Sequence, residues 1–240
     1  MDKDKLIAIA DKYDNYTSFI QDNPIYYPRI FTDKSDIEIM AVISAWLAYG
    51  DKKECMDAIK SLLVNIIKEP TKWLLSQEYK KYKDNYSCLY RMTTWHNFYH
   101  LCDKMYKAID NNGDIVSAIG HKYKYPYQNL CELFYGETLI PSPQSHCSNY
   151  NMNLLLRWMV RKGEHDIGIW SEYFSPDKLI IPCDITSMRN ALKLGIITRK
   201  DVNKNNAMKI TEYANGLFPN DPAKFSFALD NLHKEELYNE

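Results

Sequence analysis

Apolar residues recur with a helical period along most of the chain. Residues 33–49 carry one stripe of small and apolar side chains, made up of Ile37, Met40, Ala41, Ser44, Ala45 and Ala48. Gly50 follows directly and is a common helix stop, so the pattern predicts a helix over 33–49. A second helix is predicted over 54–67, ending before Pro70. We expect these two helices to form the centre of an all-α core.

The remaining segments continue this pattern. Further helices are predicted over 93–109, 127–135, 153–161, 184–194, 201–216 and 221–231. Residues 80–90 are polar and rich in tyrosine, and residues 141–151 are rich in helix breakers, so both are expected to be loops or irregular turns. No alternating pattern is long enough to predict a useful strand. The predicted fold class is therefore all-α.

The length of the chain, 240 residues, allows a sizeable core in one large or two small lobes. No apolar run approaches the roughly 20 residues that a membrane-spanning helix needs. The amino terminus, MDKDKLIAIADKYD, is acidic and interrupted, whereas a signal peptide is basic and then apolar. We therefore expect a cytoplasmic protein with no membrane partner.

The cysteines and histidines do not form a recognisable metal motif. Six cysteines, at 55, 88, 102, 131, 147 and 183, are scattered singly, so none of the close spacings typical of zinc, iron–sulfur or redox sites occurs. Only His96 and His100 have helical metal-binding spacing with an acid nearby, and the sequence identifies no third ligand. We therefore predict reduced, mostly buried thiols, no metal and no cofactor.

Charge is unevenly distributed along a nearly neutral chain. The net charge of −1 argues against a protein that coats nucleic acid by bulk electrostatics. Residues 150–204 nevertheless contain nine Lys or Arg against six acids, and the final twenty residues contain two Lys against five acids. A local basic face on a neutral body favours a site-specific nucleic-acid enzyme over a packaging protein.

An acid stands at the predicted start of the 184–194 helix. The apolar run from Leu179 stops at Asp184, and Thr186 and Ser187 fall in the first turn that follows. An aspartate there predicts an N-cap, which accepts hydrogen bonds from backbone N–H groups and complements the helix dipole. Arg189 and Lys193 would add positive charge to the same helix. Capping alone accounts for Asp184 without any chemistry.

The same stretch resembles the VDTHVxRVxxRLG segment of the helix-hairpin-helix (HhH-GPD) DNA glycosylases, the endonuclease III superfamily. The matching positions are Asp184, Arg189, Lys193, Leu194 and Gly195. The resemblance implies that Asp184 is the catalytic acid. In that family the acid also lies at a helix start, so the capping and catalytic interpretations coincide.

A broader resemblance covers nearly the whole chain. The segments DNPIYYPRIF, DIEIMAVISAWLAYG, NLLLRWMVRK, DIGIW and KLIIPCD resemble a bacterial family of conserved hypothetical proteins. That family is similar to the archaeal 8-oxoguanine DNA glycosylases and looks like a divergent branch of the same superfamily. The resemblance implies one helical unit over 1–240, with a cleft between two lobes, approximately 34–135 and 1–33 plus 136–240.

The chain departs from the superfamily pattern at several positions. Tyr150 stands where bifunctional members carry the lysine that attacks the sugar, and a tyrosine cannot form a Schiff base. Asn151 replaces a neighbouring basic residue, and Asp51 replaces a glutamine. The hairpin SHCSNYN also lacks the glycine-rich turn that normally holds a DNA phosphate. These changes imply a monofunctional enzyme that uses water, or a member that has lost activity.

The expected function is removal of a damaged base, such as the oxidised purine 8-oxoguanine, from double-stranded DNA. Asp184 would stabilise the developing oxocarbenium sugar or activate water. The resemblance implies DNA contacts by Asn151, Asn153, Arg157, Arg189 and Lys193, and a base pocket with Trp170, Asp51 and Trp46. Core packing is the alternative interpretation of the tryptophans. The alternative function is a catalytically inactive helical protein that binds DNA or a partner.

Overall fold

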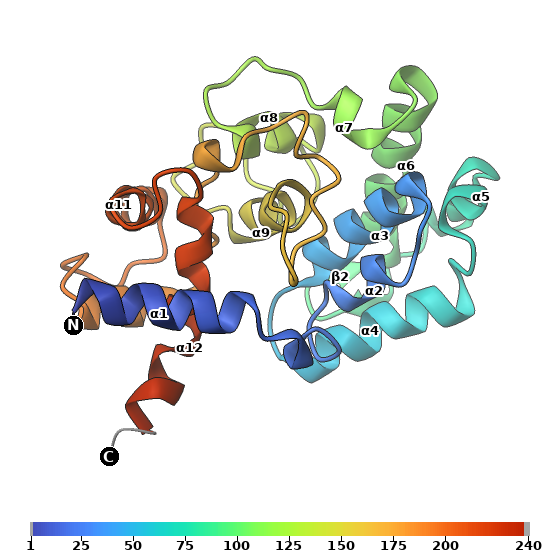
Figure 1. Cartoon of the computed structure of the whole chain (residues 1–240). Helices are drawn as coiled ribbons and strands as arrows, with labels where there is room; N and C mark the ends of the chain where they lie inside the picture. Colours follow the sequence, from blue (N-terminus) through green and yellow to red (C-terminus); the bar gives the residue numbers. More distant parts are fainter. Residues whose placement is uncertain (1, 238–240) are drawn as a thin grey trace. The chain divides into compact units, whose positions relative to one another are not determined.

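The structure is a computed structural model that describes residues 2–237, and its regular secondary structure is almost entirely helical (Figure 1). The predicted all-α class is therefore confirmed. The chain divides into two compact units. The central unit comprises Phe19–Lys124 and Gln128–Pro143, and the terminal unit comprises Met1–Ser18, Tyr125–Tyr127 and Gln144–Glu240. Within the described part of the chain, no helix has both the length and the apolar character needed to cross a membrane.

This division differs from the predicted lobes in three places. Residues 19–33 and 136–143 belong to the central unit, and residues 125–127 belong to the terminal unit. The short helix α2 (Tyr26–Arg29) packs against α3 (Lys34–Leu47), and the Tyr27 hydroxyl donates to the carbonyl of Met56 at 2.8 Å. Tertiary contacts that the sequence pattern does not reveal therefore decide where residues 19–33 belong.

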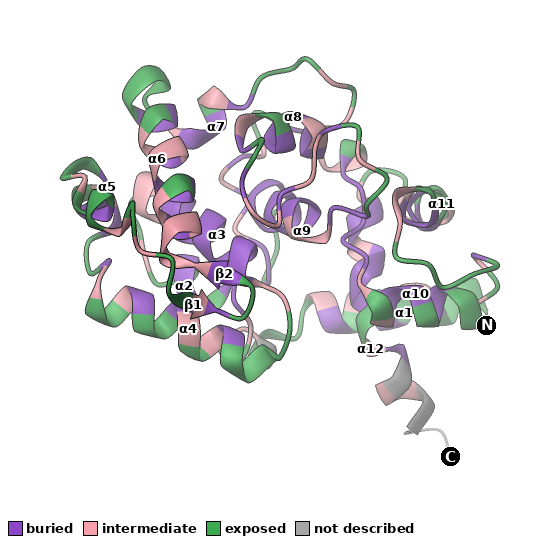
Figure 2. Ribbon diagram, turned by 180° about the vertical axis from the view of Figure 1, so that it is seen from behind, coloured by how far each residue is buried: buried purple, intermediate pink, exposed green. Residues whose placement is uncertain are grey.

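The central unit is built mainly from helices. These are α2, α3, α4 (Lys52–Asn65), α5 (Pro70–Leu75), α6 (Trp95–Asn112), α7 (Ile115–Ala118) and most of α8 (Pro126–Leu133), with a 3₁₀ turn at Glu78–Tyr82. A further 3₁₀ turn, Thr17–Phe19, spans the point where the chain passes from one unit to the other. Helix α3 is buried from Ile37 to Leu47, as Figure 2 shows, and its N-cap is Asp33, where the predicted helix begins. A helix that is buried on all sides is typical of a core position, as predicted for this segment. Helix α4, predicted to share that position, buries only Cys55, Ile59 and Leu62 and is otherwise exposed or partly exposed.

A small hairpin lies where the sequence predicts a loop. Strands β1 (Cys88–Tyr90) and β2 (Thr93–Thr94) pair antiparallel, with Cys88 opposite Thr94 and Tyr90 opposite Thr93. The Tyr90 hydroxyl donates to the carbonyl of Tyr49 at 2.5 Å, and the Tyr49 hydroxyl donates to that of Tyr90 at 2.8 Å. These strands are too short to produce an alternating pattern, so only tertiary pairing reveals them.

The terminal unit contains the other helices. These are α1 (Lys3–Asp14), α9 (Tyr150–Val160), α10 (Ile185–Lys193), α11 (Lys204–Asn215) and α12 (Phe225–Leu237), with 3₁₀ turns at Pro176–Lys178 and Pro222–Lys224. Helix α9 is buried from Met152 onwards (Figure 2). Both α1 and α10 pack against α12. This unit contains the predicted catalytic aspartate.

Candidate active site

Asp184 caps helix α10, as its sequence context predicts. Its Oδ1 accepts hydrogen bonds from the backbone N–H of Ser187 at 2.8 Å and from the Ser187 hydroxyl at 3.0 Å. The segment before it is buried and is fastened to α11, where the N–H of Ile181 donates to Thr211 Oγ1 at 3.1 Å. Asp184 itself is partly exposed, and its Oδ2 has no hydrogen-bond partner among residues 2–237. One carboxylate oxygen is thus fixed while the other is available.

A second carboxyl group, which the sequence interpretation missed, lies beside this cap. The Ser187 hydroxyl is 3.3 Å from Asp230 Oδ1 on α12, as well as 3.0 Å from Asp184 Oδ1. A serine hydroxyl has one hydrogen and cannot donate to both acids at once. Protonation of one carboxyl group would supply the second donor that this geometry needs.

Asp230 holds a proton more tightly than an ordinary carboxyl group. Desolvation by the surrounding protein, followed by the charge of Asp184, raises the pKa of Asp230 to about 7, whereas Arg157 opposes that shift. The residue is nevertheless exposed at the surface, so water offsets part of the desolvation. The raised pKa favours the protonated form of Asp230, which can donate to Ser187.

The junction between α10 and α12 holds this pair together. Asn190 is buried, and its Nδ2 donates to the carbonyl of Leu229 at 2.6 Å. Ser187 and Asn190 are three residues apart and lie on the same face of α10. Asp230 directly follows Leu229, so a single helix contact sets the distance between the two carboxyl groups.

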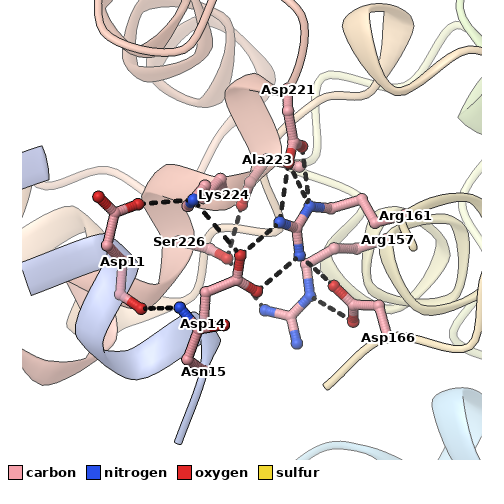
Figure 3. Close-up of polar contacts among 10 residues, drawn as sticks. All are labelled: Asp11, Asp14, Asn15, Arg157, Arg161, Asp166, Asp221, Ala223, Lys224 and Ser226. Atoms are coloured by element: carbon pink, nitrogen blue, oxygen red, sulfur yellow. Dashed lines mark hydrogen bonds and ion pairs between the residues drawn. The ribbon is translucent and has the colours of Figure 1, made fainter. Parts of the chain in front are cut away.

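Arg157, predicted to bind DNA, is instead part of the protein interior. It is buried, its Nη1 donates to Ser226 Oγ at 3.0 Å, and its Nε lies 3.4 Å from Asp166 Oδ1 (Figure 3). Its guanidinium also lies over the Phe227 ring, 4.7 Å from the centroid. A buried cation is stable only when it is paired, so Arg157 is committed to the fold and is not presented to a phosphate.

Arg161 is the centre of the same buried network. Its guanidinium contacts Asp221 at 2.8 Å, Asp14 at 3.1 Å and Asp166 (Figure 3). Burial disfavours the charged form of Arg161, but the three carboxylates outweigh burial and raise its pKa. Because Asp14 lies in α1 and Asp221 precedes α12, the network ties the first helix of this unit to its last.

The predicted hairpin leads directly into α9. Tyr150 is the first residue of α9, and both Tyr150 and Asn151 are partly exposed. Asn149 adopts a left-handed conformation, with φ of 54°, and so turns the chain where the family resemblance leads one to expect glycine. Asn153, predicted to contact DNA, is buried, and its Nδ2 donates to the carbonyl of Ser148 at 3.0 Å. Its role is to hold the hairpin.

The two tryptophans predicted to form a base pocket are core residues. Trp170 is fully buried in the terminal unit, and Trp46 is 1% exposed in the central unit, where its Nε1 donates to the carbonyl of Thr138 at 2.7 Å. Neither ring lines an open surface. Asp51 is exposed and caps α4, accepting from the N–H of Glu54 at 3.0 Å.

Two of the predicted DNA-binding residues do lie on a surface. Arg189 and Lys193 are both exposed and are four residues apart on α10, the helix that Asp184 caps. Residues four apart share a helix face, so the two cations form one positive strip. The candidate site therefore consists of Asp184, Ser187 and Asp230, with Arg189 and Lys193 on the adjoining helix surface.

Sequence comparison extends over both units. The family described as "Protein of unknown function (DUF2400)" matches residues 23–235, a span that includes Asp184, Ser187 and Asp230. No curated protein and no solved structure matches the chain. Because the match covers most of its length, the chain belongs to the DUF2400 family.

Proposed function

We propose that this protein is a monofunctional DNA glycosylase that hydrolyses the N-glycosidic bond of a damaged base in double-stranded DNA. The observation that carries the proposal is the state of Asp184, whose Oδ1 is held by its own helix and whose Oδ2 has no hydrogen-bond partner in the described chain. The resemblance of the surrounding residues to the helix-hairpin-helix glycosylases supports it. An oxidised purine such as 8-oxoguanine is the proposed lesion.

The proposed chemistry requires a fixed carboxylate beside the sugar. The damaged base leaves the duplex stack, which costs a few kcal/mol, and positive charge then develops at the sugar carbon as the glycosidic bond breaks. The available oxygen of Asp184 would stabilise that charge or accept a proton from the attacking water. Tyr150 offers no amine, so water is the proposed nucleophile.

Asp230 would act on this chemistry through Ser187. A neutral Asp230 donates to the Ser187 oxygen, which in turn donates to Asp184, so the three side chains form one directed hydrogen-bond chain. In this state the pair carries one negative charge, placed on Asp184. We therefore assign Asp230 and Ser187 as positioning residues.

Arg189 and Lys193 are the proposed phosphate contacts. Both are exposed on α10, and lysine or arginine on a phosphate positions a duplex without reading its sequence. They would partly offset the repulsion between DNA and the acid pair. Loss of either charge would therefore weaken binding to all duplexes alike.

The test is base excision from duplexes that carry 8-oxoguanine, uracil, hypoxanthine or an alkylated base, followed by alkali to cleave abasic sites. We expect the wild type to act on at least one duplex, and Asp184→Asn to lose activity by about 10²-fold or more while still binding that duplex. Asp33→Asn is the matched control, because Asp33 is an exposed N-cap of α3.

Failure of the wild type to release any of these bases would contradict the glycosylase assignment. Retained binding to the duplexes would then favour the alternative of an inactive DNA-binding protein. That alternative is supported by Tyr150, which stands where bifunctional glycosylases carry a nucleophilic lysine. A borohydride-trapped covalent adduct would show instead that another lysine attacks the sugar, and would contradict the monofunctional mechanism.

A further inference from the structure

Two histidine side chains converge at the start of α6, in the central unit. His96 Nε2 and His100 Nε2 lie 3.1 Å apart. The helix begins with a capping box, in which Thr94 accepts from the N–H of Asn97 while the Asn97 side chain accepts from the N–H of Thr94. That box fixes the first turn, so the two imidazoles lie one above the other on a defined helix face.

The His96 ring is held in place from its other side. Its Nδ1 contacts the backbone carbonyl of Lys83, its backbone N–H donates to the carbonyl of Asn85 at 2.7 Å, and the Tyr86 ring lies 4.4 Å from the imidazole centroid. A carbonyl only accepts, so Nδ1 carries the hydrogen and the Nε2 lone pair of the neutral ring points to His100. Metal-binding histidines are typically oriented by this kind of contact.

We propose that His96 and His100 together bind one divalent transition-metal ion of borderline softness, such as Cu²⁺, Ni²⁺ or Zn²⁺. An ion roughly 2.0–2.1 Å from two nitrogens that are 3.1 Å apart makes a nitrogen–metal–nitrogen angle of about 100°. That angle lies between the ideal values for square-planar and tetrahedral coordination. In the metal-free pair the Nε2–H of His100 donates to His96. On metal binding that proton leaves Nε2 for solvent while Nδ1 of the same ring takes one up, so two coordinate bonds replace the hydrogen bond and His100 stays neutral.

The surroundings of His100 favour its neutral form. Burial, followed by the charge of His96, lowers the pKa of His100, and a deprotonated ring is the form that binds a metal. Lys104 and Lys107 lie nearby, but Lys107 is 2.6 Å from Asp103 and Lys104 is 3.8 Å from Glu137. These ion pairs reduce the repulsion that an incoming cation meets.

The site has two protein ligands and leaves room for others. Residues 2–237 contain no cluster of three or more His, Cys, Asp or Glu side chains suited to a metal, so water or a bound anion would have to complete the proposed coordination. His100 also lines a polar cavity of about 610 Å³, together with Tyr99, Asp103, Lys104 and Glu137. Small ligands therefore have access to the open coordination positions.

The experiment is a calorimetric titration of the full chain with Ni²⁺ and Zn²⁺. It is carried out in a Cys88→Ser/Cys147→Ser background, because these two thiols are exposed and would compete for the metal. We expect one equivalent to bind. His96→Asn and His100→Asn should each weaken binding on the order of 10²-fold, because the second imidazole binds a metal ion that the first already holds in the same molecule.

His146→Asn is the matched control, because His146 is exposed and lies outside the pair, in the terminal unit. This variant should keep the affinity of the background protein. With Cu²⁺, electron paramagnetic resonance should show coupling to two nitrogens, reduced to one in either single variant. Absence of binding, or unchanged affinity in both His96→Asn and His100→Asn, would overturn the proposal. Neither result depends on glycosylase activity.

Discussion

At the scale of single residues, Asp230 changes the chemistry of the candidate site most. It directly follows the buried run 225–229 of α12, and its carboxyl reaches Ser187 and is close enough to Asp184 for their charges to interact. An acid at the end of an apolar run is common at helix surfaces, so the sequence does not single out Asp230. Its partner is 43 residues away in the chain, so spacing alone does not identify the pair.

The raised pKa of Asp230 predicts how stability varies with pH. A carboxyl whose pKa rises from 3.8 unfolded to about 7 folded stabilises the protein at low pH, and this contribution is lost as pH rises toward and through 7. Asp230→Asn stays neutral and should be more stable than the wild type at pH 8, by about 1–2 kcal/mol after allowing for solvent screening. Urea denaturation at pH 5 and pH 8 measures the difference.

Asp201→Asn is the control for this prediction, since Asp201 is an exposed aspartate in the same unit. Its stability should follow the pH dependence of the wild type. An identical pH dependence in Asp230→Asn would show that the Asp230 carboxyl titrates at an ordinary pKa and that the directed hydrogen-bond chain is absent.

At the scale of elements, the contact between α10 and α12 sets the geometry of the site. Asn190→Ala removes the buried hydrogen bond to the Leu229 carbonyl and should cost about 1–3 kcal/mol of unfolding free energy. Asn65→Ala offers a matched comparison, because Asn65 bonds Ser61 on an exposed surface, and it should change stability by less than about 0.5 kcal/mol. Equal losses in the two variants would contradict the structural role of Asn190.

Local signals predicted some elements closely. Helix α10 was predicted over 184–194 and runs from Ile185 to Lys193, because the cap and the following Gly195 are both encoded nearby. Helix α1 was missed, although Leu6, Ile9, Ala10 and Tyr13 form its buried stripe. Charged residues dominate the composition of that stretch and obscure the helical pattern. The apolar stripe is recognised as a buried face only once the structure shows α12 packed against it.

The burial of Arg157 has a physical explanation. The segment NLLLRWMVR places two arginines among apolar residues, and an arginine surrounded by buried positions requires an internal acid. Asp166, five residues after Arg161, is that acid. In the sequence, the apolar neighbours of both arginines indicate that they are buried. Only the folded structure identifies their acidic partners.

At the scale of the molecule, the Arg161 network joins segments from both ends of the terminal unit. Arg161→Ala would leave Asp166 buried without its closest cation, and we expect a loss of about 3–5 kcal/mol in unfolding free energy. Arg199→Ala, which breaks an exposed ion pair with Asp201, should cost at most about 1 kcal/mol. Thermal denaturation compares the two, and similar losses would contradict the central role of Arg161.

The burial of that network also separates two kinds of arginine by their response to ionic strength. Dissolved ions screen charges that face water and hardly reach a guanidinium that is 2% exposed. Added salt would therefore weaken the attraction between Arg189 and a DNA phosphate while leaving Arg161 and its three carboxylates nearly unaffected. A salt titration would thus distinguish loss of DNA attraction from loss of the fold, within one protein and without a substitution.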